Sequence, residues 1–271
     1  MKRLVPIAVA FFAAILCTGC QERGAQTPMA PAPPTAEAAR ADFDHSAFDQ
    51  ILRAHVKDGM VDYQALKNQQ AAALDRYLQS LAAADPKSFA NRDDELAYWL
   101  NAYNAFVIAG VLEHYPDIGS VMDVPEFFKA KRWKAAGQVR SLDEIENDII
   151  RHVFEDPRIH FILVCAAQSC PPLQAEAMHP ERLQSQLDAA ARAALNSARY
   201  VREDPGRKVL HLTRIMSWYR EDFVQEAGSL QTYVARYLKP PAKSRLHGSE
   251  YSIEFMDYDW ALNDAGSSPP R

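Results

Sequence analysis

The chain has 271 residues, 48% of them hydrophobic, and a formal net charge of −5 at pH 7. This length supports one domain with a sizeable hydrophobic core. The acidic balance argues against a nucleic-acid-binding protein. Two of the four cysteines lie within the first 20 residues, so a folded domain after them has only Cys165 and Cys170. A domain of this size does not need disulfides for its stability.

The first residues are typical of a secretory signal. Lys2 and Arg3 form a short positive region, and residues 4–16 are almost wholly apolar. This apolar run is too short for a normal membrane span, so we predict a signal peptide over residues 1–19. The small residues before Cys20 resemble the lipobox of bacterial lipoproteins, in which the cysteine thiol is lipidated.

The lipobox pattern has one departure, because Cys17 stands where leucine is usual; an ordinary cleaved signal is the alternative. Residues 20–41 are rich in Ala, Pro and Gln, which predicts a flexible tether. We therefore expect a bacterial envelope protein that is anchored to a membrane through lipid on Cys20 and faces the periplasm. Without the lipid, the protein would be soluble in the periplasm or secreted. A globular domain is expected over residues 42–264, with a disordered tail at residues 265–271.

The first half of this domain has helical patterns. Apolar residues at helical spacing predict helices over residues 48–56 and 66–81, separated by a turn at Asp58–Gly59. The clearest helix covers residues 93–114, whose first turn carries three acids that complement the helix dipole. A capping box at residues 141–144 opens a further helix that continues to about Val153.

Strands are expected mainly in the second half. Residues 159–165 are nearly continuous in apolar character, which predicts a strand buried on both faces. Residues 209–212 and 251–256 predict two more strands, and the segments between them predict helices over residues 179–196, 217–226 and 229–238. The pattern indicates a helix-rich α+β single domain around a small central β-sheet.

The loop after the buried segment has the most chemically active residues. Cys165 ends the predicted strand, and Ser169 and Cys170 follow in a polar loop of the kind that presents functional groups. We therefore expect Cys170 to be the more exposed of the two cysteines. Three interpretations remain open: an activated Cys170 thiol, a disulfide between the two cysteines, or two packed core residues. If residues 159–165 form an extended strand, His160 lies roughly 20 Å from the end of the strand where the cysteine loop begins. We therefore interpret His160 as a hydrogen-bonded structural residue.

Two other segments supply candidate pocket residues. Asn101 and Asn104 flank Tyr103 on the long helix; their amides either clamp the backbone of a neighbouring loop or orient a substrate. A second group pairs aromatic side chains with an acid at the start of a helix, and it consists of Trp218, Tyr219 and Asp222. Beyond residue 20, the sequence lacks the common zinc, redox, phosphate-loop and serine-hydrolase motifs. We expect neither a metal nor a cofactor.

Several of these motifs together resemble the DUF547 family, whose function is undefined. They are residues 99–105 (WLNAYNA), 142–146 (LDEIE), 156–161 (DPRIHF), 164–165 (VC), 169–171 (SCP), 218–219 (WY), 222–223 (DF) and 258–263 (YDWALN). The core of the resemblance spans about residues 93–223. One departure is Asn147, where the family pattern usually has histidine. If that histidine is catalytic in the family, this chain lacks it.

Two classes of function follow from the sequence. The first is a periplasmic binding or scaffolding domain that recognises an envelope partner or a small ligand. The second is a thiol-dependent enzyme that acts on peptide or amide bonds with Cys170 as its nucleophile. The first is preferred because the sequence contains no complete catalytic set.

Overall fold

The computed structural model describes residues 42–266. The predicted signal peptide, the lipid attachment residue Cys20, the tether to residue 41 and residues 267–271 lie outside the described residues. Ala265 still donates its N–H to the carbonyl of Val61 at 2.9 Å. The ordered chain therefore continues beyond the predicted end at residue 264.

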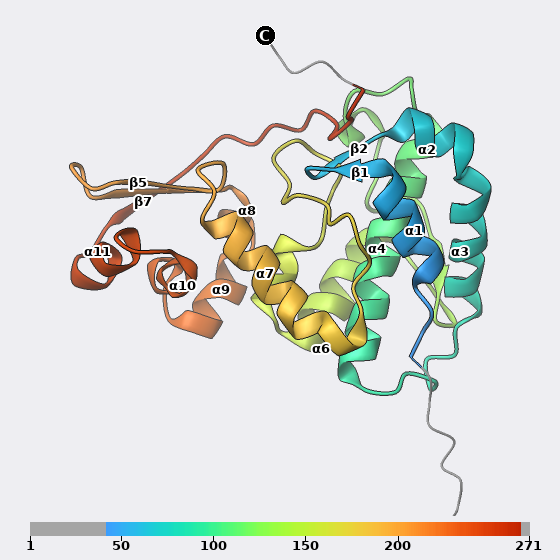
Figure 1. Ribbon diagram of the computed structural model, residues 1–271, viewed down its shortest axis with the longest axis horizontal. Helices are drawn as coiled ribbons and strands as arrows, with labels where there is room; N and C mark the ends of the chain where they lie inside the picture. Colours follow the sequence, from blue (N-terminus) through green and yellow to red (C-terminus); the bar gives the residue numbers. More distant parts are fainter. Residues whose placement is uncertain (1–41, 267–271) are drawn as a thin grey trace, which may run out of the picture. The chain divides into compact units, whose positions relative to one another are not determined.

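The long helix predicted from the sequence forms the centre of the domain. It is α4 (Arg92–His114), and its residues from Leu96 to Leu112 are buried on all sides. A helix that is buried all round belongs in a core rather than at a surface. The Asn91 side chain accepts hydrogen bonds from the first N–H groups of α4 and so fixes its start. In Figure 1, α4 lies between α3 (Ala71–Ala83) and α7 (Leu183–Leu195), and it contacts both.

The region before α4 consists of three helices and a short hairpin. Their bounds are α1 (Ser46–His55), β1 (Val56–Lys57), β2 (Met60–Val61), α2 (Tyr63–Gln69) and α3. The predicted turn at Asp58–Gly59 is confirmed, since both residues have positive φ and connect β1 to β2. The single helix expected over residues 66–81 is instead divided at Gln70 into α2 and α3.

The capping box at Ser141 is confirmed and begins a helix with an unusual middle. α5 (Leu142–Glu144) continues into a π-helical stretch, η2 (Ile145–Arg151), and then into α6 (His152–Phe154). Ser141 and Glu144 satisfy each other's backbone N–H groups at the start of this helix. π-helical stretches are rare and occur frequently at functional sites.

The prediction of a buried strand over residues 159–165 is wrong. Residues Pro157–Phe161 form a 3-10 helix, η3, and residues 162–170 are buried but irregular. Asp156 caps η3 through the N–H of Arg158, and Pro157 sets the first helical position. Apolar character alone predicted burial correctly, but it does not separate a strand from a short buried helix.

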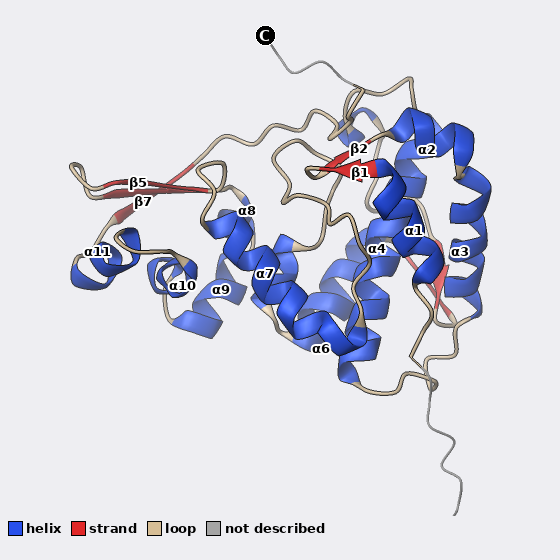
Figure 2. Ribbon diagram, viewed as in Figure 1, coloured by secondary structure: helices blue, strands red, loops and turns tan. Residues whose placement is uncertain are grey.

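The strands among residues 42–266 form three separate small sheets rather than one central sheet (Figure 2). Besides the β1–β2 hairpin, β3 (Trp133–Ala135) pairs with β4 (Gln138–Arg140). In the third sheet, β6 (Val209–Leu212) pairs antiparallel with β5 (Val201–Asp204) and parallel with β7 (Ser252–Phe255). The strands predicted at residues 209–212 and 251–256 are thus confirmed, and the domain is a helix-rich α+β structure.

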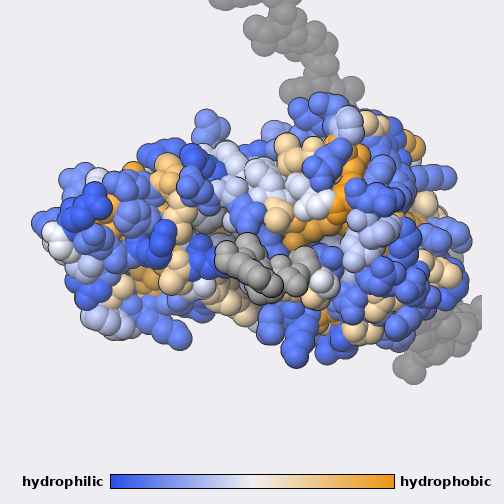
Figure 3. All heavy atoms as spheres, turned by 90° about the horizontal axis from the view of Figure 1, so that it is seen from above, coloured by the Kyte–Doolittle hydropathy of each residue, from blue (hydrophilic) through white to orange (hydrophobic). Residues whose placement is uncertain are grey.

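Short helices complete the second half of the domain. They are η1 (Val121–Asp123), η4 (Pro180–Arg182), α7, α8 (Ile215–Trp218), α9 (Arg220–Ala227), α10 (Leu230–Tyr237) and α11 (Ala242–Gly248). None of the helices in residues 42–266 is long and apolar enough to cross a membrane. On the face shown in Figure 3, hydrophilic side chains surround a narrow strip of apolar ones.

A buried histidine near α1 makes the stability of the domain depend on pH. His45 is 3% exposed, and its Nδ1 lies 2.7 Å from the hydroxyl of Tyr77. Burial lowers the pKa of His45 from 6.5 to about 3. Between these two pH values, His45 is therefore protonated in the unfolded chain and neutral in the folded domain. Stability from this group is present above pH 6.5 and is lost as the pH falls towards 3.

We predict that His45→Gln flattens the acid dependence of unfolding. The slope of the unfolding free energy between pH 6 and pH 4 should fall by about 1 kcal/mol per pH unit. Urea unfolding followed by circular dichroism at several pH values measures this slope. Equal slopes in the variant and the unmodified protein would show that His45 is not the buried neutral group.

Candidate functional site

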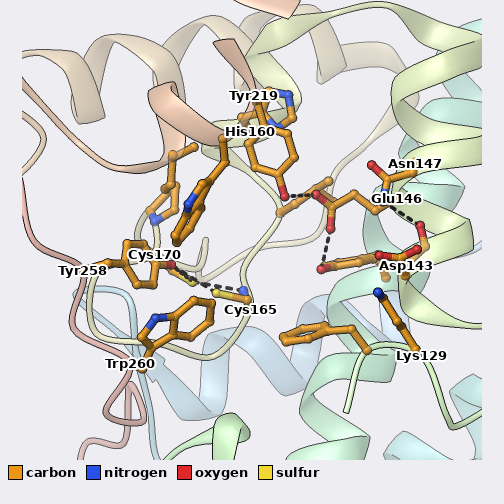
Figure 4. A pocket seen from close by; sticks show the side chains of 16 residues that line it. Lys129, Asp143, Glu146, Asn147, His160, Cys165, Cys170, Tyr219, Tyr258 and Trp260 are labelled. Carbon is orange, nitrogen blue, oxygen red and sulfur yellow. Dashed lines mark hydrogen bonds between the residues drawn. The ribbon is translucent and has the colours of Figure 1, made fainter. Parts of the chain in front are cut away.

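A cavity of about 280 Å³ lies between η2, the 162–171 segment, α8 and the C-terminal segment. Figure 4 shows Glu146, Asp143 and Lys129 on one side of this cavity and the two thiols with Tyr258 and Trp260 on the other. Its wall thus combines acidic, basic, thiol and aromatic side chains. Ligand sites in proteins are typically cavities of this mixed character.

The two thiols are free and converge on one tyrosine. Cys170 Sγ accepts the N–H of Cys165 at 3.0 Å, and it lies 3.1 Å from the hydroxyl oxygen of Tyr258. Cys165 Sγ lies 3.2 Å from the same oxygen. Because the tyrosine hydroxyl has one hydrogen, it donates to one sulfur and accepts from the other.

The surroundings of each thiol determine which sulfur accepts the hydrogen of the Tyr258 hydroxyl. Burial opposes ionisation of Cys170, but hydrogen bonds from Cys165, Tyr258 and the loop backbone outweigh it and lower the pKa of Cys170. The neighbouring Cys170 sulfur, together with burial, raises the pKa of Cys165 well above its ordinary value. Burial also raises the pKa of Tyr258. Cys170 is therefore the acceptor and the more nucleophilic sulfur, and Cys165 keeps its proton.

An acidic side chain on the π-helical stretch forms the second centre of the cavity. Glu146 accepts hydrogen bonds from the hydroxyl of Tyr103 on α4, at 2.8 Å, and from the hydroxyl of Tyr219. Burial, reinforced by the charge of Glu146, raises the pKa of both tyrosines. The two hydroxyls therefore remain donors at neutral pH and hold the Glu146 carboxyl group in one orientation.

His160 contacts an ion pair rather than a thiol. Its Nε2 lies 2.6 Å from Asp222, and its ring stacks on Tyr219 with the centroids 4.0 Å apart. Arg151 binds Asp222 through two hydrogen bonds of 2.8 Å and is itself bound by Asn147 at 2.6 Å. Burial lowers the pKa of His160, which keeps the ring neutral at pH 7.

Asp222 remains charged in this cluster. Burial opposes its ionisation, but the hydrogen bonds from His160 and Arg151 outweigh that effect and hold the pKa of Asp222 well below its usual range. Since a charged carboxylate only accepts hydrogen bonds, His160 has its hydrogen on Nε2. The cluster links η2, η3 and α9 behind one wall of the cavity.

Three aromatic rings form the opposite wall. The rings of Trp218 and Trp260 lie 4.7 Å from that of Tyr258, measured between centroids, and 5.7 Å from each other. Trp218 is 48% exposed, which is unusual for so large an apolar side chain. We call these three residues the aromatic wall. An exposed aromatic surface beside a cavity marks an interaction site.

The C-terminal segment places two of these rings by pairing with the cysteine loop. Gln168 donates its N–H to Ala261 at 2.7 Å, and Ser169 donates its N–H to Asp259 at 3.1 Å. Asp259 in turn donates its N–H to the hydroxyl of Ser169 at 2.9 Å. Because Tyr258 and Trp260 flank Asp259, these bonds fix their position against Cys170.

The structure brings together six of the residues suggested by the sequence. Residues lining the cavity are Tyr103, His160, Cys165, Cys170, Trp218 and Tyr219. Asp222 lies behind them against His160, and Ser169 faces the C-terminal segment. Two expectations are wrong. The 20 Å separation of His160 from the loop assumed a strand that does not form, and Cys170 is the more buried cysteine, not the more exposed one.

Asn101 and Asn104 contact backbone and do not line this cavity. Asn101 donates to the carbonyl of Met178 and accepts its N–H, both at 2.9 Å. Asn104 donates to the carbonyl of Ile162 at 3.1 Å and accepts the N–H of Val164 at 3.0 Å. Each side chain thus satisfies two buried backbone groups, which would cost about 1–3 kcal/mol each if left unpaired.

The cavity is also lined by five residues that were not predicted as pocket residues: Lys129, Asp143, Glu146, Tyr258 and Trp260. Four of them lie in motifs that the sequence displays, residues 142–146 and 258–263. Nothing in their spacing shows that these motifs meet across the cavity. Among residues 42–266, no group of three or more His, Cys, Asp or Glu side chains could hold a metal ion.

The fold and cavity define a helix-rich α+β domain with a thiol-containing, aromatic-walled pocket. The family model described as protein of unknown function, DUF547, matches residues 86–194. This match confirms, over residues 86–194, the resemblance that the motifs indicate. Trp218, Tyr219, Tyr258 and Trp260 of the pocket lie beyond the matched residues. No curated protein and no solved structure matches the chain.

We predict that the cysteine loop is sensitive to the hairpin packed on it. Gly59 has φ +82°, and a Cβ there would lie 2.6 Å from Pro172 Cβ. Gly228 has nearly the same φ, +79°, with nothing within 4 Å of such a Cβ. Gly228→Ala should cost about 1 kcal/mol of stability from backbone strain, and Gly59→Ala about 1–3 kcal/mol more from overpacking. Urea unfolding measures both, and equal losses would exclude the contact with Pro172.

Proposed function

We propose that this chain is an exported envelope lipoprotein whose domain binds a small ligand in the aromatic-walled cavity. The observation that carries the proposal is the cavity itself, which the half-exposed Trp218 of the aromatic wall and the acidic Glu146 both line. Such a site buries the flat face of a ring and orients its polar end through a few fixed groups.

The charges around the cavity favour a cationic or neutral ring compound. Asp143 and Glu146 contribute two acidic side chains, whereas Lys129 contributes the opposing ammonium group. A cation held near tryptophan and tyrosine faces gains a further attraction to the rings, of about 0.5–2 kcal/mol. An anionic ligand would be repelled by the negative charges of Asp143 and Glu146 and by a Cys170 thiolate.

The export and anchoring rest on the N-terminal sequence. A positive start, an apolar stretch and small residues before Cys20 support cleavage at that cysteine and lipid attachment to it. The proline- and alanine-rich residues that follow would then act as a spacer between the membrane and the domain. The ligand would come from the envelope, on the periplasmic side.

A thiol-dependent enzyme acting on peptide or amide bonds is the second candidate. One observation favours it, since Cys170 accepts hydrogen bonds that stabilise its thiolate. Ligand binding remains the preferred function because the Nε2 of His160 is bound to Asp222 and not to a thiol. Under the enzyme hypothesis, Cys170→Ser would abolish hydrolysis of amide substrates while leaving ring binding intact.

We predict that benzylamine binds in the cavity at least about tenfold more tightly than benzoate, a difference of about 1.4 kcal/mol. The two probes share a ring and differ in charge, so the ratio reports the acidic side chains. Ligand-observed NMR and titration calorimetry on the full chain measure both affinities. Trp218→Ala should weaken both probes, Glu146→Gln should reduce the ratio, and the distant exposed Val153→Ala should change neither. Equal binding of both probes, or no binding, would reject this cavity as a cation-selective site.

We predict that Cys20→Ala either releases the protein from the membrane fraction or leaves it as an unprocessed precursor. A lipid anchor contributes about 0.8 kcal/mol per buried methylene, which the variant cannot gain. Intact-mass measurement and membrane fractionation of the expressed protein test this, with Cys17→Ala as the matched control that should retain the lipid. An unchanged mass and distribution for Cys20→Ala would exclude lipidation at this residue.

A further inference from the structure

We propose that Cys165 and Cys170 form a redox-active dithiol that exchanges with small disulfide compounds, with Cys170 attacking and Cys165 resolving. This activity is separate from the binding of a ring ligand. It rests on the convergence of two free thiols on one hydroxyl group, at 3.2 and 3.1 Å from Tyr258 Oη (Figure 4). Two core cysteines without a role would have no need of a shared polar partner.

The loop between the cysteines turns back on itself. Ala166 has φ +63°, and the N–H of Cys170 bonds the carbonyl of Ala167 at 3.1 Å. This turn brings Cys170 Sγ to 3.0 Å from the backbone nitrogen of Cys165. The sulfur of residue 170 therefore lies beside the backbone of residue 165, which makes the two cysteines close neighbours in space.

Outer contacts hold this turn in place from both sides. Tyr200 donates its hydroxyl to the carbonyl of Cys170 at 2.8 Å, and Asn263 donates its N–H to the carbonyl of Ala166 at 2.9 Å. Gly59 leaves room for Pro172, two residues after Cys170. These contacts keep the loop in the conformation that brings both thiols to Tyr258.

The roles of the two sulfurs follow from their surroundings. Cys170 accepts hydrogen bonds from the Cys165 N–H and from Tyr258, and thiolates are the attacking species in thiol–disulfide exchange. Both cysteines line the cavity, so a small disulfide that enters it meets Cys170. Cys165 holds its proton until Cys170 becomes part of a disulfide and no longer accepts hydrogen bonds as a charged group.

The exchange balances in two steps. The Cys170 thiolate attacks one sulfur of the small disulfide, the S–S bond of that compound breaks, and one thiolate leaves and takes a proton from water. Cys165 then loses its proton to water, attacks Cys170 Sγ and displaces the second thiolate, which also takes a proton from water. The protein dithiol is oxidised by two electrons, and the small disulfide is reduced to two thiols.

Oxidation of the pair would also change the aromatic wall. Tyr258 would lose the charged acceptor that orients its hydroxyl, because disulfide sulfur is a weak acceptor. Its ring contacts those of Trp218 and Trp260 at 4.7 Å. Tryptophan fluorescence therefore reports the redox state of the pair independently of any chemical label.

The test uses the full chain in glutathione buffers of increasing oxidised fraction, followed by alkylation and tryptic digestion. Both cysteines fall in one tryptic peptide, residues 159–182, so an internal disulfide removes two hydrogens from that peptide and blocks both labels. We expect alkylation of this peptide to fall about tenfold at high glutathione disulfide, with a parallel change in fluorescence. Cys165→Ser should stop at a glutathione adduct on Cys170, whereas Cys170→Ser should gain neither adduct nor internal disulfide.

Two results would overturn the proposal: full alkylation of both cysteines in the unmodified chain at every glutathione ratio, or an unmodified Cys170 in a folded Cys165→Ser variant. Near-ultraviolet circular dichroism establishes that each variant is folded. Benzylamine binding is measured separately on the unmodified chain in reducing buffer, so that a failure of thiol exchange is distinguished from a failure of the ligand site.

Discussion

The buried backbone of residues 162–170 must find hydrogen-bond partners without belonging to a sheet, and much of the structure serves this requirement. A buried peptide group without a partner costs as much as a lost hydrogen bond, so each one needs a donor or an acceptor nearby. Asn104 on α4 supplies both for Ile162 and Val164. The C-terminal segment supplies partners for Gln168 and Ser169.

The cavity is a consequence of this arrangement. Once the C-terminal segment is paired with the loop, Tyr258 lies on the two thiols and Trp260 stands beside it. The π-helical stretch brings Glu146 and Asn147 to the opposite side, where Tyr103 and Arg151 hold them. Side chains from distant parts of the chain therefore become neighbours because backbone groups, rather than apolar contacts alone, determine where the segments lie.

The sequence predicted well those features that depend on local patterns. The start of the helix at Ser141 follows from its capping box, and α4 follows from its acidic first turn and its length. The segment around His160 was misjudged because a short apolar run indicates burial without indicating backbone conformation. A strand would have carried His160 away from the loop, whereas the 3-10 helix and irregular chain leave it in the cavity wall.

Several residues of the site could be identified from the sequence, but their arrangement in space could not. Tyr103, Cys170 and Tyr219 were identified from residue types in suggestive positions, but Tyr258 and Trp260 depend on pairing between segments about 90 residues apart. One sequence contains no signal for such pairing. The roles of Asn101 and Asn104 could likewise be assigned only once the positions of Met178 and Ile162 were known. The sequence of the helix that carries the two asparagines does not reveal those positions.

Amide hydrogen exchange of residues 162–170 tests the central claim most directly. If the partners on α4 and in the C-terminal segment hold this irregular backbone, its amides exchange as slowly as those of α4. In Asn104→Leu their exchange should accelerate, while the amides of β5 and β6 stay unchanged. Rapid exchange of residues 162–170 in the unmodified protein, as in an ordinary surface loop, would contradict it.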